Sequence, residues 1–413
     1  MKFLLIIFCF ASFGLLSQVK HTPIIFVHGM LAAGDTWSKP VQQFRKAGYS
    51  QDELHVLDWN TLNFNRSAAQ AQLDSLVDVV LKSTKAKKVN LVGHSAGGGV
   101  CSTYITTKKN YKRVERYVHL ASGNLPVTIK TPTLNLYSPD DLVTGGKDIK
   151  YAYNHKITGL DHYEIATSDS SVRVMYEFFN PEAELTTSAA EEVEQIRVAG
   201  KACTLGENQP ERNAEIKVYQ LDATNGTRLI SSLQTVTTDE VGNFGPIALS
   251  PAEYYEFIVY PTVGGKQPIH YFREPFQKDN GLVYLRTLPS SGFASMILGD
   301  LPANEEEVGL AIFSASKALI HGRDSLFVNG IEITTDELAS DKKTAIAFFL
   351  YKASDKELED ASPIQKFANF PFMSGADVWV KTSDEVVRLN MNDRKIVIPA
   401  IPSAEGISVV VFD

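Results

Sequence analysis

Along residues 22–180, short apolar runs alternate with amphipathic stretches. The runs are rich in β-branched and aromatic residues, and in the stretch 67–82 the larger apolar side chains recur at helical spacing. The predicted strands are 23–27, 54–59, 89–92, 114–120, 133–137 and 155–159, and the predicted helices are 37–46, 67–82, 96–106 and 172–179. Strands that alternate with helices through short connections are typical of a parallel sheet covered on both faces.

The pattern changes after residues 181–192, a polar and acidic stretch that we interpret as a linker. Beyond it, β-type runs are separated by turn pairs such as Asn225-Gly226 and Asn329-Gly330, and few stretches have helical spacing. The predicted strands are 214–221, 254–260, 283–288, 308–313, 346–351, 378–381 and 407–412. Residues 193–413 are therefore predicted to form an all-β sandwich or barrel of one or two modules, after an α/β domain over residues 18–180.

The first 17 residues have the pattern of a secretory signal peptide. Lys2 supplies a positive start, residues 3–16 are apolar or small, and Ser17 is a small residue at the expected cut. The run is shorter than the roughly 20 residues of a membrane-spanning helix, and no later run approaches that length. We therefore expect a secreted protein without a transmembrane anchor after signal removal; the alternative is a buried N-terminal strand.

Composition, net charge and cysteine count exclude some classes of protein. The chain has 413 residues, 44% hydrophobic and 21% charged, which is ordinary for a folded soluble protein. A net charge of -8 without a Lys/Arg block argues against nucleic acid as a partner. Cys9, Cys101 and Cys203 are too few for a disulfide scaffold, and the latter two are expected to be free buried thiols.

Residues 93–97 (GHSAG) form a G-x-S-x-G motif between a predicted strand and a predicted helix. In that context Ser95 lies on a tight turn at the carboxyl edge of the sheet, with its hydroxyl exposed as a nucleophile. The flanking glycines avoid a Cβ clash in the turn, and the following helix N-terminus favours developing negative charge. The alternative is a glycine-rich turn with an incidental serine.

Two backbone N–H groups are candidates for an oxyanion hole. Acyl transfer needs such donors aimed at the tetrahedral oxygen. Met30, in the His28-Gly29-Met30 segment after the first strand, can supply one, and Ala96 can supply the other. An ordinary turn at the end of a strand is the alternative for His28-Gly29.

The acid and the base are expected after the last two predicted strands. Asp140 and Asp141 follow strand 133–137, and either carboxylate could orient a histidine. We favour Asp140, because Leu142 and Val143 would then be apolar anchors and Asp141 would be solvated. His162 follows the last strand and gives the chain order Ser95, Asp140, His162; His155 competes but begins its strand.

With these residues in place, the chain resembles the α/β-hydrolase family. Residues 23–30 (PIIFVHGM) and 92–98 (VGHSAGG) look like the oxyanion and nucleophile segments of secreted microbial lipases. The α/β part is short and resembles the minimal, lidless lipases. The resemblance implies ester hydrolysis at a Ser-His-Asp triad.

The second part has a narrower resemblance, to the β-domain of archaeal-type long-chain carboxylesterases. It rests on residues 254–257 (YYEF), 269–276 (IHYFREPF) and 371–378 (PFMSGADV). In that family the domain is thought to bind lipid, which implies acyl-chain binding or contact with a lipid surface here. Phe370, Phe372 and Met373 are the weak candidates for substrate binding, against the alternative that they are core residues.

Two departures from that family matter. Its acid follows the strand that here is 117–120, where this chain has no carboxylate, so Asp140 or Asp141 must serve. Its long lid insertion is also missing, because residues 59–67 are too short to hold one. Interfacial activation is therefore in doubt.

The sequence as a whole predicts a secreted serine carboxylester hydrolase, a lipase or esterase, that requires neither metal nor organic cofactor. Three alternatives remain: a polyester depolymerase with the β part as a substrate anchor, a thioesterase or peptidase, and a non-catalytic binding module on a hydrolase fold. A secretory signal argues against coenzyme A thioesters as substrates.

Overall fold

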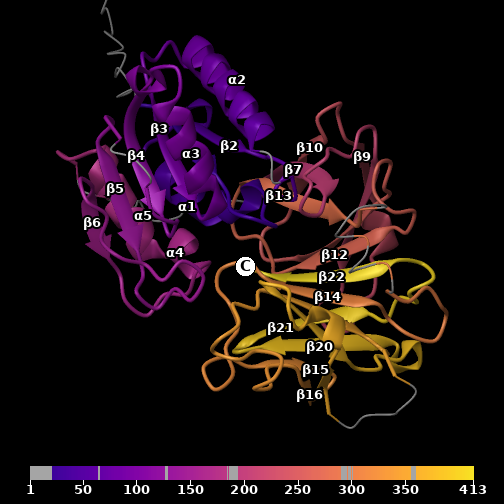
Figure 1. Ribbon diagram of the computed structural model, residues 1–413. Coiled ribbons are helices and arrows are strands. Elements are labelled where there is room, and N and C mark those ends of the chain that lie inside the picture. The colour runs from indigo at the N-terminus through magenta and orange to yellow at the C-terminus, as the bar shows by residue number, and fades with distance from the viewer. Residues whose placement is uncertain are drawn as a thin grey trace, which may run out of the picture.

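The structure is a computed structural model of the chain (Figure 1). It describes residues 21–63, 66–125, 129–183, 185, 194–289, 295, 299, 301–354 and 360–413. The predicted signal peptide and most of the predicted linker lie outside these residues. None of the helices in the described ranges is long and apolar enough to cross a membrane.

Residues 21–180, the α/β region, form a six-stranded sheet in which every pairing is parallel, in the order β2-β1-β3-β4-β5-β6. The strands are β1 (Ile24–Val27), β2 (Leu54–Leu57), β3 (Val89–His94), β4 (Val114–Leu120), β5 (Thr133–Tyr137) and β6 (Tyr153–Lys156). The helices are α1 (Ser38–Lys46), α2 (Ser67–Thr84), α3 (Ala96–Thr106), α4 (Glu164–Thr167) and α5 (Asp169–Phe179), with short 3-10 turns η1 (Gly34–Trp37), η2 (Gln51–Glu53) and η3 (Asn110–Lys112). The predicted parallel sheet is confirmed.

Helices cover both faces of this sheet because its strands are apolar on both sides. Along β1, Ile24 and Phe26 pack with side chains of α1 and α5, whereas Ile25 and Val27 pack with those of α2 and α3. One prediction is displaced: the last strand was expected at 155–159, but β6 ends at Lys156. Gly159 has a positive φ of 80° and lies in the turn that follows, so the strand cannot continue through it.

Residues 194–413, the β region, form three sheets. The strands are β7 (Ile196–Thr204), β8 (Glu215–Leu221), β9 (Gln234–Thr237), β10 (Asn243–Leu249), β11 (Tyr254–Val259), β12 (Ile269–Arg273), β13 (Asn280–Thr287), β14 (Leu310–Ser314), β15 (Leu326–Val328), β16 (Ile331–Glu332), β17 (Ala347–Tyr351), β18 (Ser362–Pro363), β19 (Met373–Asp377), β20 (Val386–Met391), β21 (Arg394–Pro399) and β22 (Ile407–Phe412). Short 3-10 turns are η4 (Ile230–Ser232), η5 (Gln365–Phe367) and η6 (Thr382–Asp384). The expected all-β class is confirmed.

A nine-stranded sheet, in the order β18-β19-β17-β14-β22-β12-β11-β8-β9, is the middle layer of the β region. Its strands are apolar on both faces: along β17, Phe349 and Tyr351 enter one core, and Phe348 and Leu350 enter the other. The first core is closed by the sheet β10-β7-β13 and the second by the sheet β16-β15-β20-β21. The region is thus a three-layer stack, which Figure 1 shows beside the α/β region.

Strand β22 joins the two parts of the middle sheet. It lies between β12 and β14 and is parallel to both, with Val409 opposite Tyr271 on one side and Ala311 on the other. Strands that precede and follow residue 300 therefore share one continuous sheet. The described residues therefore do not form two separate β modules, which was one of the alternatives predicted from the sequence.

The two regions meet in a polar, buried contact next to the loop after β1. Lys201 Nζ of β7 lies 2.9 Å from Asp58 Oδ2, and Tyr284 of β13 donates to the same carboxylate. Arg286 forms an ion pair with Asp35. Because these groups are largely desolvated, each region depends on the other for its charge compensation.

Candidate active site

Ser95 lies at the sharp turn between β3 and α3. Its backbone has φ 53° and ψ -123°, a conformation that non-glycine residues rarely adopt and that raises the side chain above the sheet. The N–H group of Ser95 donates to Leu120 O, and Ser122 Oγ donates to Ser95 O at 2.7 Å. The strain is therefore held in place by bonds to the neighbouring strand.

Two glycines of the motif are required by close backbone approach. A Cβ on Gly93 would lie 2.7 Å from Gly98 Cα, and a Cβ on Gly97 would collide with the carbonyl oxygens of Val27 and His28. Neither obstacle is a flexible side chain. The G-x-S-x-G pattern thus has a steric cause at both positions.

Ser95, His162 and Asp141 form a continuous hydrogen-bonded series. His162 Nε2 lies 2.9 Å from Ser95 Oγ, and His162 Nδ1 lies 2.8 Å from Asp141 Oδ2. His162 is in the segment between β6 and α4, and Asp141 is in the turn after β5. Both side chains are almost fully buried. The carboxyl ends of neighbouring parallel strands therefore bring together three groups that are far apart in sequence.

The carboxylate in this series is Asp141, so the prediction of Asp140 was wrong. Asp140 is exposed, and its carboxylate accepts the N–H of Gly159 at 2.6 Å. The prediction failed because it treated Leu142 and Val143 as buried anchors. They are 61% and 46% exposed, so the turn directs Asp141 inward instead.

Several donors stabilise the ionised form of Asp141. Its Oδ1 accepts the N–H groups of Val143 and Thr144, and Thr144 Oγ1 donates to Oδ2 at 2.6 Å. Burial alone would raise the pKa of Asp141, but the hydrogen bond and charge of His162, followed by these donors, lower it to about 2. The carboxylate is therefore charged at neutral pH and can stabilise an imidazolium.

His94 supports His162 from behind, a role that its motif position alone did not indicate. His94 Nε2 lies 2.8 Å from His162 O, and the centroids of the two imidazole rings are 4.8 Å apart. Burial, followed by the charge of His162, lowers the pKa of His94 to about 3. His94 therefore stays neutral, and its Nε2–H can donate to the His162 carbonyl.

The loop that carries Met30 is braced from the β region. Leu31 has a positive φ of 60°, and its N–H donates to Thr61 Oγ1, which in turn donates to Gly206 O at 2.7 Å. Asn208 Nδ2 donates to the carbonyls of Ala32 and Trp59, both at 2.9 Å. No local motif marks Asn208 or Gly206, so sequence reasoning missed them.

Met30 and Ala96 both lie beside Ser95. Ala96 is the first residue of α3, where a backbone N–H has no carbonyl partner within its own helix. A cleft of about 490 Å³ is lined by Met30, Ser95 and Ala96 and continues along Ser122 and Thr144. Met30 and Ala96, the two predicted oxyanion donors, therefore lie at the same cleft as Ser95.

Of the three weak candidates in the β region, only Phe372 reaches the site. Its ring stacks on that of His162 with centroids 5.8 Å apart and an interplanar angle of 17°. Met373 is buried in the core between the nine-stranded and three-stranded sheets, and Phe370 packs against that core. Phe370 and Met373 therefore belong to the core, which was the alternative to substrate binding.

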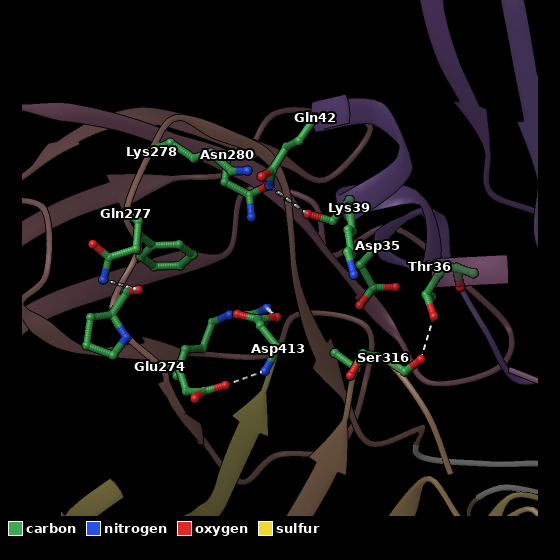
Figure 2. A pocket seen from close by; sticks show the side chains of 16 residues that line it. Asp35, Thr36, Lys39, Gln42, Glu274, Gln277, Lys278, Asn280, Ser316 and Asp413 are labelled. Carbon is green, nitrogen blue, oxygen red and sulfur yellow. Dashed lines mark hydrogen bonds and ion pairs between the residues drawn. The ribbon is translucent and has the colours of Figure 1, made fainter. Parts of the chain in front are cut away.

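A second cavity, of about 470 Å³, lies at the contact between the two regions and is not lined by Ser95. Figure 2 shows charged and amide side chains around it, among them Lys39, Glu274 and Lys278. Across the described ranges, no three His, Cys, Asp or Glu side chains are grouped to hold a metal ion. Cys101 and Cys203 are buried and free, as expected.

Comparison with known proteins gives matches in both regions. Residues 21–125 match a family model described as lipase (class 2), and residues 194–289 match one described as lipase C-terminal domain. A third model, described only as a C-terminal domain, matches residues 315–413.

One curated relative, the lysosomal thioesterase PPT2-B of Xenopus laevis, is 27% identical over 108 residues, which is 26% of this chain and 37% of that protein. This chain thus spans little more than a third of that relative's length.

Among solved structures, a Bacillus licheniformis lipase in mature form aligns with 39% of this chain and 93% of its own, at 17% identity and a TM-score of 0.33. Aspergillus fumigatus lipase B aligns with 43% and 56%, at 12% identity and a TM-score of 0.34. The two lipase models and the doubly covered parallel sheet are the stronger observations. On these, residues 21–125 are similar to class 2 lipases and residues 194–289 to lipase C-terminal domains, and the first region has the six-stranded, doubly covered parallel sheet of an α/β-hydrolase fold.

Proposed function

We propose that this protein is a secreted serine hydrolase of carboxylic esters, of the lipase or carboxylesterase type. The observation that carries the proposal is the series Asp141–His162–Ser95, with hydrogen-bond distances of 2.8 and 2.9 Å. Unlike a non-catalytic module, this chain retains a complete nucleophile, base and acid. Secretion rests on the signal-like residues 1–17.

In the acylation step, His162 Nε2 takes the proton of Ser95 Oγ as the oxygen attacks the ester carbonyl carbon. The carbonyl π pair moves onto oxygen, where the N–H groups of Met30 and Ala96 stabilise it. When the tetrahedral intermediate collapses, the C–O bond to the alcohol breaks and His162 returns its proton to the leaving oxygen. Asp141 remains ionised throughout and stabilises the imidazolium.

In the deacylation step, water takes the place of the alcohol. His162 removes a proton from the water as it attacks the acyl-enzyme, and the proton then goes to Ser95 Oγ as the carboxylic acid leaves. Every proton transfer passes through His162 Nε2. The two steps therefore need no group beyond the side chains and backbone donors already named.

The test is acid release from methyl esters of straight-chain acids, from acetate to palmitate. We expect turnover by the wild-type protein, and a loss on the order of 10⁶-fold in Ser95→Ala. Ser83→Ala, an exposed serine on α2, is the matched control and should behave as wild type. A long-chain optimum would indicate a lipase and a short-chain optimum an esterase.

Two results would contradict the proposal. Near-full activity in Ser95→Ala would remove Ser95 as the nucleophile. No acid release at any chain length would favour the polyester or binding-module alternatives instead.

Acyl thioesters are a second candidate substrate class, because the curated relative is called a thioesterase. The same triad can attack either carbonyl. S-methyl thioesters of the same acids, measured beside the methyl esters, separate the two classes by kcat/KM.

A further inference from the structure

The space around Ser95 consists of two unequal compartments, and Phe372 lines both of them. The large compartment is the cleft of about 490 Å³ described above, and it is lined by Ala96 but not by His162. The small compartment, of about 30 Å³, is lined by His162 but not by Ala96. Ser95, Met30 and Phe372 line both. The ring of Phe372 therefore borders the space on both sides of Ser95.

The chemistry of the proposed reaction assigns a role to each compartment. The leaving oxygen must come within hydrogen-bond distance of His162 Nε2, which donates the proton that it needs. The alcohol therefore departs through the small compartment, and the acyl group extends into the large cleft. The hydrolytic water must also contact His162 Nε2, so it occupies the position that the alcohol vacates.

The size of the small compartment suits water better than a large alcohol. A buried water needs roughly 10–15 Å³ of such space, so about 30 Å³ holds about two waters or one small alcohol. The compartment is walled by Leu31, Ala32 and Ile346 together with Phe372. A branched or cyclic alcohol could enter only if one of these side chains moved away.

Phe372 is held in place by the middle sheet of the β region. Its carbonyl accepts the N–H groups of Ile346 and Ala347, both at 3.0 Å, and the next residue begins β19, which pairs with β17. Its φ is 67°, a strained value for a phenylalanine, and its side chain is 8% exposed. These bonds fix the ring against His162 rather than leave it on a free loop.

We propose that Phe372, supplied by the β region, is a specificity-determining residue that restricts the leaving-group side of the active site to water and small alcohols. This inference rests on ester hydrolysis at Ser95, and it favours the carboxylesterase type over the lipase type, because the alcohol released from a triacylglycerol is a bulky diacylglycerol. It gives the β region a direct part in substrate selection that differs from acyl-chain or lipid-surface binding. Phe372 also borders the large cleft, but that cleft is about 490 Å³ in volume, so the ring restricts the acyl side far less than the alcohol side.

The test compares butanoate esters of methanol and of benzyl alcohol. In the wild-type protein, kcat/KM should be higher for the methyl ester. Phe372→Ala should lower the methyl-to-benzyl ratio at least tenfold, and Phe372→Leu, which refills most of the volume, should change it less than threefold. A ratio is insensitive to the fraction of each variant that folds.

Phe372→Gly separates volume from backbone strain, since glycine adopts a positive φ without cost. It should match Phe372→Ala; a shift in the glycine variant alone would overturn the proposal. An unchanged ratio in Phe372→Ala would also overturn it, as would an alanine variant that altered acyl-length preference instead. Failure of the proposed function looks different, because the wild type would then release no acid or Ser95→Ala would remain active.

A second measurement uses the acyl-enzyme directly. With methyl butanoate as acyl donor and added benzyl alcohol, Phe372→Ala should form at least tenfold more benzyl butanoate per butanoic acid than the wild type. An equal partition in both proteins would contradict a restriction at this position.

Discussion

The α/β region and the β region contribute to the candidate site in different ways. Ser95, Asp141 and His162 follow strands of one parallel sheet, so in the proposed mechanism the α/β region supplies every reacting side chain. The β region supplies Phe372, whose ring stacks on His162, and Asn208, which braces the loop that carries Met30. Chemistry thus comes from one region and the shape of the site comes from both.

The Asp141→Asn variant should have the largest effect among the changes that test this division. An amide cannot stabilise the imidazolium and favours the wrong tautomer of His162, so we expect kcat to fall on the order of 10³ to 10⁴-fold. Steady-state kinetics on a methyl ester measures it. Asp140→Asn should stay within about threefold of wild type, and the reverse ranking would restore Asp140 as the acid.

Next in size is the effect of breaking the contact between the regions. Lys201→Met leaves the Asp58 carboxylate buried without its cation, which should destabilise the protein by about 3 kcal/mol. Urea unfolding followed by fluorescence and circular dichroism should show one shared transition. Lys266→Met, an exposed lysine of the β region, is the control, and two separate transitions would mean that the regions fold independently.

A smaller effect is expected from the brace on the oxyanion loop. Asn208→Ala removes donors from two carbonyls, and we expect kcat to fall about tenfold, equivalent to about 1.4 kcal/mol, as the loop relaxes. Asn213→Ala, which alters an exposed asparagine of the same region, should have no such effect. An unchanged kcat in Asn208→Ala would show that the α/β region positions its oxyanion donors alone.

The last prediction concerns acid stability, and its effect per residue is no larger than that of Asn208→Ala; it is confined to the α/β region. Burial lowers the pKa of His94 to about 3 and that of His119 to about 4, so the folded protein resists protonation at both. The unfolded chain binds these protons near pH 6.5, and stability present above that pH is lost as the pH falls. At pH 5.5 each histidine should contribute about 1.4 kcal/mol of destabilisation.

Urea unfolding at pH 7.5 and 5.5 measures this loss, and His119→Asn should reduce the difference. Asp141, whose pKa is also lowered, contributes only at lower pH, as the pH falls from about 4 towards 2. No change of stability between pH 7.5 and 5.5 would contradict the burial of neutral histidines.

Local sequence was sufficient to predict a site residue where the motif has a local physical cause. The turn at Ser95 follows from a strand, two sterically required glycines and a helix, all within adjacent residues. It was insufficient for Asp140 and Asp141, because neighbouring residues with the same side chain differ only in the direction that the turn gives them. The exposure of Leu142, which decides that direction, is a property of the folded surface.

Sequence was least informative where the two regions meet. Phe370, Phe372 and Met373 are equally apolar, and only the packing of β17 against β19 decides which of them reaches His162. Asn208 resembles any turn asparagine until the loop at Ala32 is placed against it. Contacts between residues so far apart in sequence depend on the whole fold, so they cannot be predicted from any short stretch of the sequence.

The position of β22 has a consequence for how the chain is made. Its partners β12 and β14 end at Arg273 and Ser314, long before β22 begins at Ile407. Until that strand emerges from the ribosome, both partners present an open hydrogen-bonding edge, and such edges pair with other chains. Closing the sheet also requires a long loop to be ordered, which slows folding. We therefore expect self-association to compete most strongly with folding in the interval between synthesis of β14 and arrival of β22.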